Sequence, residues 1–358
     1  MANVFSFTRS AAAFAGTLGG RGGTFHNAAD RQTVICPEEM QTLRPAVILD
    51  GAFERLSNFL YPLYEQKMKT SFSGGQTRHA PTCAYTFKKA HVIFGSFIGN
   101  NARYRIRPPR EAGPPKRFEK LERIALCTGT TGDLRFGHCL NEDLPQMLLA
   151  PAFGEPARLP SKNWEDLFAY RDYLDLEWRE IDGAVIEEAT VFRDYSQNSN
   201  HRARFQELRR RLRDKVAGAA TGGRFYLRRG DTGAALRSPD NDDEICKRLE
   251  ERGYDIIDVE GGDPQKFISN ILDRQIMVSV EGSHMMHLVY TIMTGGGALA
   301  LMPPLQPRCA IKDACDAVDA HFGAVIGYET ETGYRIDTDE LGETLDRLER
   351  RVGNLEEV

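Results

Sequence analysis

The chain has 358 residues, a formal net charge of −5 at pH 7 and 41% hydrophobic residues. At about 150 residues per domain, this length predicts two domains. The hydrophobic content excludes a globally disordered or fibrous protein. The mild negative charge gives no electrostatic reason to expect binding to nucleic acid.

The seven cysteines are an odd number and form no C-x-x-C pair. This pattern argues against a disulfide framework or a zinc ribbon, and it favours a reducing compartment. The uncharged stretch 282–307 is long enough to raise the question of a membrane span, but its His, Gly and Pro residues divide it into short apolar pieces. We therefore expect a cytoplasmic protein without a transmembrane segment, and peripheral association with the inner face of the membrane stays open.

The N-terminal half has an irregular pattern. We expect a flexible segment over residues 1–30 and an α/β domain over 31–215 on the acceptor side. Prolines predict a loop over 103–123. The apolar runs predict a helix at 164–173 and strands at 46–49, 91–94, 123–127 and 184–192.

A basic helix is predicted over 201–215, because Phe205, Leu208 and Leu212 recur at helical spacing. We interpret this helix as the bridge between the two domains. The last helix carries an apolar stripe of Leu341, Leu345, Leu348 and Val352. We expect segment 331–358 to pack back at the domain junction.

Residues 216–330 alternate between strand and helix patterns. Asn241 and Glu244 have the spacing of a capping box for a helix that ends at Gly253, and Asp263–Pro264 has the pattern of a second helix start. This alternation predicts a Rossmann-like domain with a parallel sheet. Its predicted strands are 224–228, 254–260, 275–281, 298–302 and 324–328, with helices also at 283–294 and 310–321.

Ligands of open α/β sheets bind beyond the carboxyl ends of the strands. After the predicted strand 275–281 come Glu281, Gly282, Ser283 and His284, and His287 follows one helical turn later. Gly282 would let a ligand approach the backbone, the helix start would suit a phosphate, and Glu281 could bind a sugar hydroxyl. A tight turn with two partly buried histidines is the structural alternative.

Arg228 and Arg229 end the first strand of the same domain. An arginine at this position could neutralise a diphosphate through a bidentate hydrogen-bonded fork. A surface ion pair is the structural alternative.

A third candidate follows the predicted strand 123–127. His138 and Glu142 are four residues apart and share a helical face, with Asp143 next to them. A histidine beside a carboxylate is a workable general base, because its ordinary pKa of about 6.5 lies near operating pH. A satisfied hydrogen-bonded pair is the structural alternative.

Two patterns are set aside. The acidic run 240–243 lies where a helix should begin, so the helix dipole explains its charges. The H-x-x-H pair of His284 and His287 lacks further ligands at metal spacing, so no metal is expected.

The candidate stretches indicate a family when they are taken together, in their order along the chain. FGHCLNEDLPQMLL, FYLRRG, NDDE, VEGSHMMHLVY and LALMPP resemble, in this order, glycosyltransferase family 61, which is also the family of domain of unknown function 563. The similarity covers residues 120–305. The chain departs from many relatives at three positions: it has Glu281 where they have His, Cys139 where they have Trp, and Gln146 where they have Arg. The donor sugar and the acceptor therefore stay undetermined.

The resemblance implies a GT-B fold, in which two Rossmann-like domains face each other across a cleft. It implies a nucleotide-sugar donor, with a UDP-sugar favoured, that is held by the C-terminal domain. It also implies inverting transfer of a hexosyl or pentosyl group to a glycan acceptor, without a cofactor or an obligatory metal. The chain is similar to bacterial members that act in capsular or other surface polysaccharide assembly.

Under this hypothesis of glycosyl transfer, Arg228 would stabilise the leaving diphosphate, with help from Arg229 and the backbone at 282–283. His138 is the favoured base, oriented by Glu142. Direct action of Glu142 or Asp143, and then of Glu281, are the alternatives. A non-catalytic nucleotide-sugar-binding protein is the competing function. A dinucleotide-dependent enzyme is disfavoured because no G-x-G-x-x-G follows an early strand.

Overall fold

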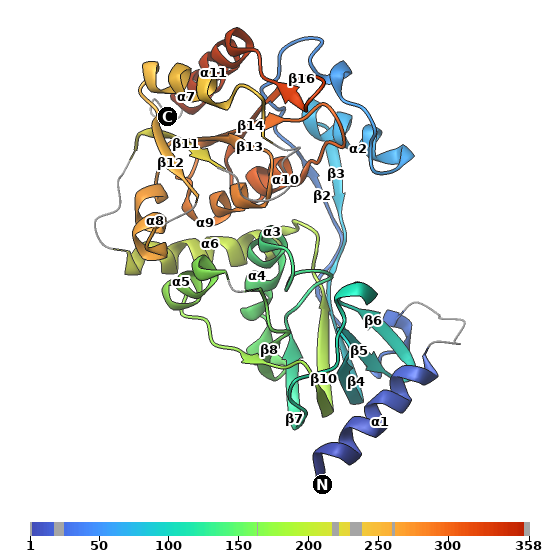
Figure 1. Ribbon diagram of the computed structural model, residues 1–358. Helices are drawn as coiled ribbons and strands as arrows, with labels where there is room; N and C mark the ends of the chain where they lie inside the picture. Colours follow the sequence, from blue (N-terminus) through green and yellow to red (C-terminus); the bar gives the residue numbers. More distant parts are fainter. Residues whose placement is uncertain are drawn as a thin grey trace. The chain divides into compact units, whose positions relative to one another are not determined.

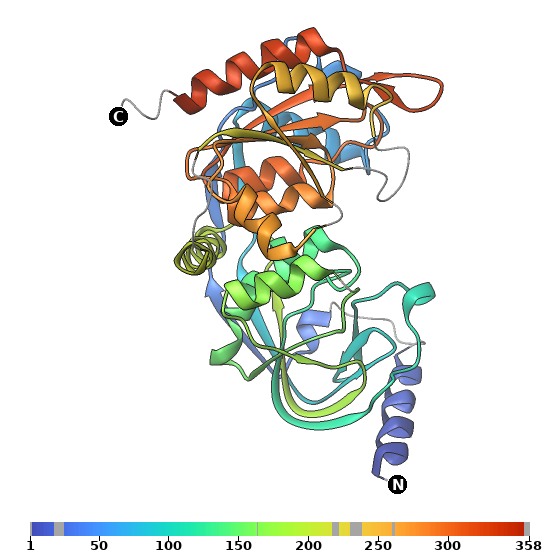
Figure 2. The ribbon, with the colours of Figure 1, turned by 60° about the vertical axis from the view of Figure 1, so that its left-hand side comes forward.

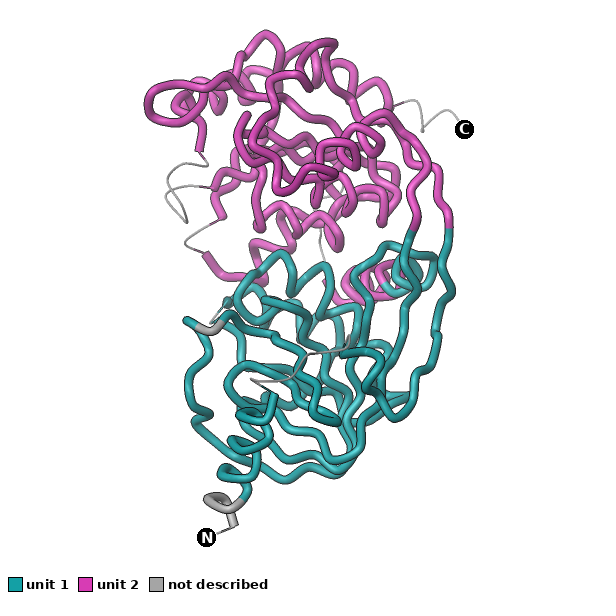
Figure 3. Tube along the Cα trace, turned by 90° about the vertical axis from the view of Figure 1, so that its right-hand side faces the viewer, with its two compact units in different colours: residues 1–39, 79–204 teal, residues 40–78, 205–358 magenta. Residues whose placement is uncertain are grey.

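The computed structural model describes residues 2–17, 25–162, 164–216, 222–229, 238–259 and 262–353. The chain divides into two compact units (Figure 3). Unit 1 comprises Met1–Glu39 and His79–Arg204, and unit 2 comprises Met40–Arg78 and Phe205–Val358.

Unit 1 is built on one mixed sheet. Its strands are β1 (Arg31–Cys36), β4 (Thr82–Ile93), β5 (Ser96–Gly99), β6 (Ala102–Arg105), β7 (Glu119–Leu126), β8 (Glu155–Arg158), β9 (Arg179–Glu180) and β10 (Ala184–Arg193). The strand order in the described part of the unit is β6-β5-β4-β10-β7-β8-β9, and β1 also pairs with β4. β4 is antiparallel to β1, β5 and β10, whereas β7 is parallel to β8 and β10. This sheet differs from the all-parallel sheet that the family resemblance implies for the N-terminal half.

Two tight turns explain the antiparallel part of this sheet. Phe94 and Gly95 join β4 to β5, and Asn100 and Asn101 join β5 to β6, all four with positive φ. Two-residue turns with positive φ at both positions match the twist of antiparallel strands. The asparagine pair is a turn signal that the sequence interpretation overlooked, because it considered only the apolar runs.

The predicted loop over 103–123 is shorter than expected. β6 continues to Arg105 and β7 begins at Glu119, so strand structure occupies both ends of the predicted loop. The prolines lie between the two strands, where they interrupt no ladder. The first half of β7 was missed because its charged side chains are mostly exposed, and only its second half is an apolar run.

A helix forms near the N-terminus, where the sequence predicted a flexible segment. Helix α1 (Ala2–Gly16) packs on the sheet of unit 1. Its Phe7 and Phe14 rings meet Phe94 edge to face, and Phe7 also meets Phe118. The Ala-rich sequence of this segment supports helix formation, and the phenylalanines supply the buried face.

Unit 2 is built on a parallel sheet, as predicted. Its strands are β11 (Arg224–Arg228), β12 (Asp255–Asp258), β13 (Ile276–Val280), β14 (Gly297–Met302) and β15 (His321–Ile326). Among the described residues they are ordered β12-β11-β13-β14-β15 and all pairs are parallel. This is a doubly wound order, and β13 and β14 are buried along their whole length, which accounts for their continuous apolar sequences.

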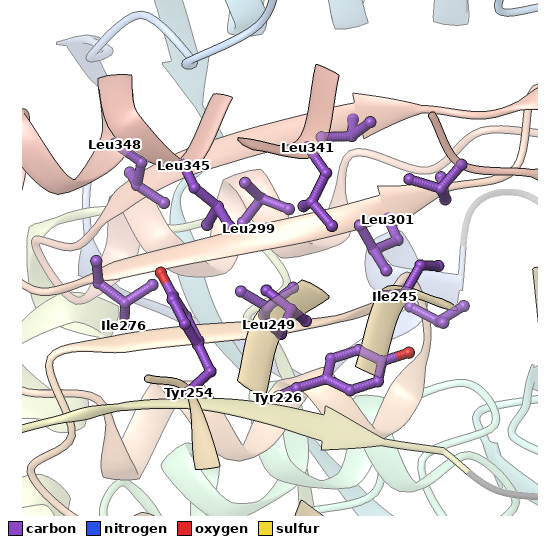
Figure 4. Close-up of a cluster of buried hydrophobic side chains, with 14 of the residues drawn as sticks. Tyr226, Ile245, Leu249, Tyr254, Ile276, Leu299, Leu301, Leu341, Leu345 and Leu348 are labelled. Carbon is purple, nitrogen blue, oxygen red and sulfur yellow. The ribbon is translucent and has the colours of Figure 1, made fainter. Parts of the chain in front are cut away.

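Helices cover both faces of this sheet (Figures 1 and 2). One face carries α7 (Asp242–Glu251) and α11 (Thr338–Gly353), and the other carries α8 (Pro264–Ile271), α9 (Leu288–Thr291) and α10 (Ala310–Ala317). The predicted stripe of α11 is buried against the sheet of unit 2 itself, together with residues of α7 (Figure 4). Leu341, Leu345 and Leu348 are each 0% exposed there.

Residues 40–78 group with unit 2. They include α2 (Pro62–Ser73), and the flanking strands β2 (Glu39–Thr42) and β3 (Gln76–His79) pair with each other. Val47 forms a bridge with Gly323 of β15, and the Phe72 ring lies 5.6 Å from that of Phe322. The predicted strand at 46–49 is therefore reduced to a single bridge.

The remaining elements agree with the predictions to different extents. The predicted helix 310–321 ends at Ala317, and the predicted strand 324–328 is β15, which spans His321–Ile326. Helices α5 (Glu165–Tyr173) and α6 (Ser199–Lys215) are confirmed, and the boundary between the units falls inside α6. β12 is shorter than the predicted strand 254–260, whose last residue lies outside the described residues. The predicted helix 283–294 is a 3-10 turn at Ser283–His287 followed by α9.

The helix starts differ in their chemistry. Asp263 accepts a hydrogen bond from the Gln265 N–H at 2.9 Å, as predicted. Asn241 precedes α7 but makes no side-chain cap hydrogen bond. Its amide instead exchanges two hydrogen bonds with the backbone of Ile336, so a distant segment takes over the capping residue.

Candidate active site

The two segments that carry the predicted donor residues follow neighbouring strands of the unit 2 sheet. β11 lies between β12 and β13, and the doubly wound order changes direction between β11 and β13. Because Leu227 pairs with Ser279, Arg228 and Arg229 emerge beside the segment that begins at Glu281. Ligands of open α/β sheets bind at this topological switch point.

Arg228 is held by carboxylates of the next helix. Its Nε donates to Asp242 at 2.7 Å and its Nη2 donates to Asp243 at 2.7 Å. Asp242 also accepts from the Tyr226 hydroxyl at 2.6 Å. These contacts, of which that with Asp242 is the largest cause, raise the pKa of Arg228. Asp242 and Asp243, which begin α7, therefore hold Arg228 in an ion pair, the structural alternative left open by the sequence.

The turn after β13 depends on a glycine for space. A Cβ on Gly282 would lie 2.9 Å from Cε1 and 3.0 Å from Nδ1 of His284. Gly282 has extended φ of 174°, so the requirement is steric rather than conformational. Glu281 and Gly282 are buried, whereas Ser283 is exposed.

A polar relay below this turn sets the tautomer of His284. Ser279 Oγ donates to the Leu227 carbonyl at 2.6 Å, which uses its one proton. His284 Nε2, 2.7 Å from the same oxygen, must then be the donor. The relay joins β11, β13 and the turn, so His284 supports the turn from inside.

His287 is a core residue in this structure. It is 0% exposed, and its ring meets Phe267 edge to face at 5.0 Å. Burial, with a smaller effect of His284, lowers the pKa of His287 to about 3. A neutral, enclosed imidazole of this kind does not present a charge to a ligand.

In unit 1, the predicted His–Glu pair forms on an irregular helix. The segment consists of α3 (Phe136–His138), a π-helical turn at Cys139–Asp143 and α4 (Leu144–Met147). His138 Nδ1 lies 2.7 Å from a Glu142 carboxylate oxygen, and the imidazole side chain is 50% exposed. With Nδ1–H donated to the carboxylate, Nε2 keeps its lone pair. The contact with Glu142 raises the pKa of His138.

Asp143 is placed differently from its neighbour. It is 0% exposed, accepts from the Gly129 N–H at 2.8 Å and lies 3.5 Å from Arg158. A Cβ on Gly132 would fall 2.3 Å from its carboxylate, so the glycine-containing loop closes over it. Burial raises the pKa of Asp143 to about 8, although Arg158 opposes the shift. An enclosed carboxyl of this kind holds the loop and has no access to an acceptor hydroxyl.

Several buried polar residues beneath the His138 helix were missed. His201 Nε2 donates to the Asn141 carbonyl at 3.0 Å, and Asp194 receives a two-pronged ion pair from Arg204 at 2.7 and 2.8 Å. The sequence pattern predicted only a basic helix in this region. His201 and Arg204 lie on the same helical face as the apolar stripe, and this position could have indicated that both are buried.

Three further properties bear on the class of protein. All seven cysteines are free and buried. In the parts of the chain that the structure describes, no helix is long and apolar enough to cross a bilayer. No group of three or more His, Cys, Asp or Glu side chains that could hold a metal ion occurs among those residues.

Comparison with known proteins places these residues in context. No curated protein matches the chain. Residues 136–304, just under half of the chain, match the family model described as Glycosyltransferase 61. The matched segment runs from the His138 helix through the β13 turn to the end of β14. This match supports the assignment of the chain to glycosyltransferase family 61.

Proposed function

We propose that this protein is an inverting glycosyltransferase that moves a sugar from a nucleotide-sugar donor to a hydroxyl of a glycan acceptor. The family match supports glycosyltransferase activity. The finer proposal is supported by the strand register, in which the ends of β11 and β13 are neighbours at the switch point of the parallel sheet, one followed by Arg229 and the other by the Glu281–Ser283 turn.

In this proposal the switch point binds the donor. Arg228 and Arg229 face the diphosphate, and the backbone N–H groups at Gly282 and Ser283 approach it closely. Glu281 binds a sugar or ribose hydroxyl. The first turn after Gly282 is a short 3-10 helix, so we assign the phosphate contact to these backbone groups rather than to a helix dipole.

His138 is the proposed base. Its Nε2 accepts the proton of the acceptor hydroxyl while that oxygen attacks the anomeric carbon. The bond from that carbon to the diphosphate breaks, and its electron pair leaves with the diphosphate. Glu142 holds the ring through Nδ1 and stabilises the imidazolium that forms. Glu142 and Asp143 are weaker candidates, since the first is occupied by His138 and the second is enclosed.

The wider biological assignments rest on the family resemblance. They are a UDP-sugar donor, metal-independent transfer of a hexosyl or pentosyl group, a GT-B arrangement of the two units, and a cytoplasmic role in surface polysaccharide assembly. Peripheral association with the membrane belongs to the same proposal.

Thermal-shift screening against nucleoside diphosphates and nucleotide sugars tests the donor site. A ligand that binds the folded state raises its apparent stability by mass action. The best ligand should lose its effect in Arg229→Ala and in Gly282→Ala, and keep it in His138→Ala. Transfer to a glycan acceptor should disappear in His138→Ala.

Product analysis separates the competing function. A non-catalytic binding protein would keep the thermal shift and release no nucleoside diphosphate with any acceptor tried. Retention of the donor's anomeric configuration in the product would contradict the inverting mechanism.

A further inference from the structure

A groove on unit 2 lies beside α11, apart from the switch-point residues. Its volume is about 340 Å³, and among the described residues it is lined by Ala46, Val47, Ile48, Arg347, Arg350 and Arg351. Small-molecule sites commonly measure about 300–1,000 Å³. The lining combines three cationic side chains with three apolar ones and includes no acidic residue. We call it the arginine groove.

The charges of α11 are segregated around the helix. Asp346 and Glu349 both contact Arg252, and Glu349 also accepts from the Tyr254 hydroxyl at 2.9 Å. These acidic side chains are therefore matched on the side toward α7 and β12. The three arginines of the groove lie toward residues 45–48, where the lining is uncharged.

Two of the arginines are held in place by one contact each. Arg351 Nη1 donates to the Pro45 carbonyl at 2.7 Å, and Arg347 Nη2 donates to Glu343 at 2.6 Å. A guanidinium has five N–H donors, so each contact leaves most of the fork for another acceptor. Arg350 is exposed. The groove thus presents two guanidinium groups, those of Arg347 and Arg351, whose positions are set before a ligand arrives.

A nearby histidine responds to this positive potential. His321 begins β15, and Arg44 lies close by in an ion pair with Asp319 at 2.6 Å. Burial lowers the pKa of His321, and the charges of Arg44 and Arg351 lower it further.

The helix dipole favours arginines at a helix C-terminus, which explains their presence in the last turns of α11. It does not explain their convergence on a concave surface.

The groove is also separate from the switch point. Val47 pairs with Gly323 in the first half of β15, and Arg351 contacts Pro45. The Gly282 turn follows the carboxyl end of β13. All strands of a parallel sheet run in the same direction, so the groove and the Gly282 turn lie at opposite ends of the strands. Occupation of one site therefore does not require occupation of the other site.

We propose that the arginine groove binds a phosphate group of an anionic ligand. Guanidinium forks match phosphate oxygens in bidentate geometry, and three of them converge here. The groove has room for more than a phosphate, and residues 46–48 form an apolar side on which further groups of the ligand would lie. The phosphate belongs either to an anionic lipid headgroup or to a soluble phosphate compound.

Two probes test the site and identify its source. Inorganic pyrophosphate is titrated calorimetrically, and binding to vesicles of phosphatidylcholine is compared with and without phosphatidylglycerol. Binding should weaken at least about tenfold in Arg347→Ala/Arg350→Ala and fall with increasing salt. Arg350→Glu is a single, exposed second variant that should weaken binding in the same direction.

The controls separate this site from general charge and from the proposed donor site. Arg210→Ala/Arg335→Ala removes the same charge elsewhere on the surface and should bind like wild type. Arg228→Ala should remove any pyrophosphate binding at the proposed donor site, and in this variant pyrophosphate binding in the groove and vesicle binding should persist at the wild-type affinity. Binding of pyrophosphate alone assigns a soluble ligand, and binding of anionic vesicles assigns a lipid. If neither probe binds, or if both groove variants bind like wild type, the proposal is wrong.

Discussion

His201 Nε2 donates a hydrogen bond to the carbonyl oxygen of Asn141, 60 residues away, at 3.0 Å. That carbonyl belongs to the π-helical turn between His138 and Glu142. A side chain that takes a carbonyl from a helix is a recognised cause of such irregularities. His201 therefore fixes the backbone that carries the candidate base.

Replacement of His201 by alanine should remove this support. We expect a loss of about 2 kcal/mol in the free energy of unfolding, because a buried carbonyl loses its donor. The pKa of His138, followed by NMR, should fall toward its ordinary value as the contact with Glu142 loosens. Arg210→Ala, on an exposed part of the same helix, should change neither quantity. An unaltered His138 titration in a folded His201→Ala protein would refute the positioning role.

Asp194 makes the stability of unit 1 depend on acid. Burial alone would raise its pKa, but the facing His201 and Arg204 outweigh burial and lower it to about 2. The folded value is below the unfolded value, so this stabilisation is complete above about pH 4 and is lost as the pH falls toward 2. The contribution is about 2 kcal/mol.

Urea unfolding between pH 6 and pH 2 measures this dependence. Asp194→Asn should be less stable at neutral pH and should lose less stability between pH 4 and pH 2. Parallel curves for the two proteins over that range would show that Asp194 keeps an ordinary pKa.

The Glu142–His138 pair predicts a pH effect on catalysis. Glu142→Gln removes the carboxylate that raises the pKa of His138, so the imidazole should lose its proton at a lower pH. The acidic limb of kcat should move to lower pH, and kcat at its plateau should fall about 10- to 100-fold because the imidazolium is no longer stabilised. His138→Ala is the reference, since it should show no transfer at any pH. A limb that stays in place in Glu142→Gln would point to another base.

Gly282→Ala tests the turn after β13. The added Cβ would meet the His284 ring at 2.9 Å, and that ring is held by Ser279. We expect a loss of about 1–2 kcal/mol in stability and the loss of nucleotide-induced stabilisation. Gly262→Ala is the matched control, because a Cβ there has no atom within 4 Å.

A double variant checks the cause of this effect. In Gly282→Ala/His284→Ala the ring that the new Cβ would strike is absent, so the two substitutions should be less costly together than the sum of the single effects. Additive losses would mean that Gly282 is required for a reason other than this contact.

Local sequence patterns were enough to predict the parallel sheet of unit 2 and to select the candidate residues. β13 and β14 are buried along their whole length, so their apolar runs are readable without knowledge of their neighbours. The start of α8 follows from local chemistry in the same way, because Asp263 accepts a hydrogen bond from the Gln265 N–H. Arg228 ends β11 and Gly282 comes two residues after β13, and these two strands are adjacent and parallel.

The accessibility of these residues depends on the three-dimensional fold. Asp143 and Glu142 are neighbours in the chain, yet one is enclosed by the Gly129–Gly132 loop and the other holds an exposed imidazole. Residues 40–78 join unit 2 through contacts with β15 nearly 280 residues away, and His201 reaches Asn141 across 60 residues. The periodicity of hydrophobic residues indicates whether a segment favours a helix or a strand. Burial and long-range pairing depend on distant parts of the chain, which a local pattern does not identify.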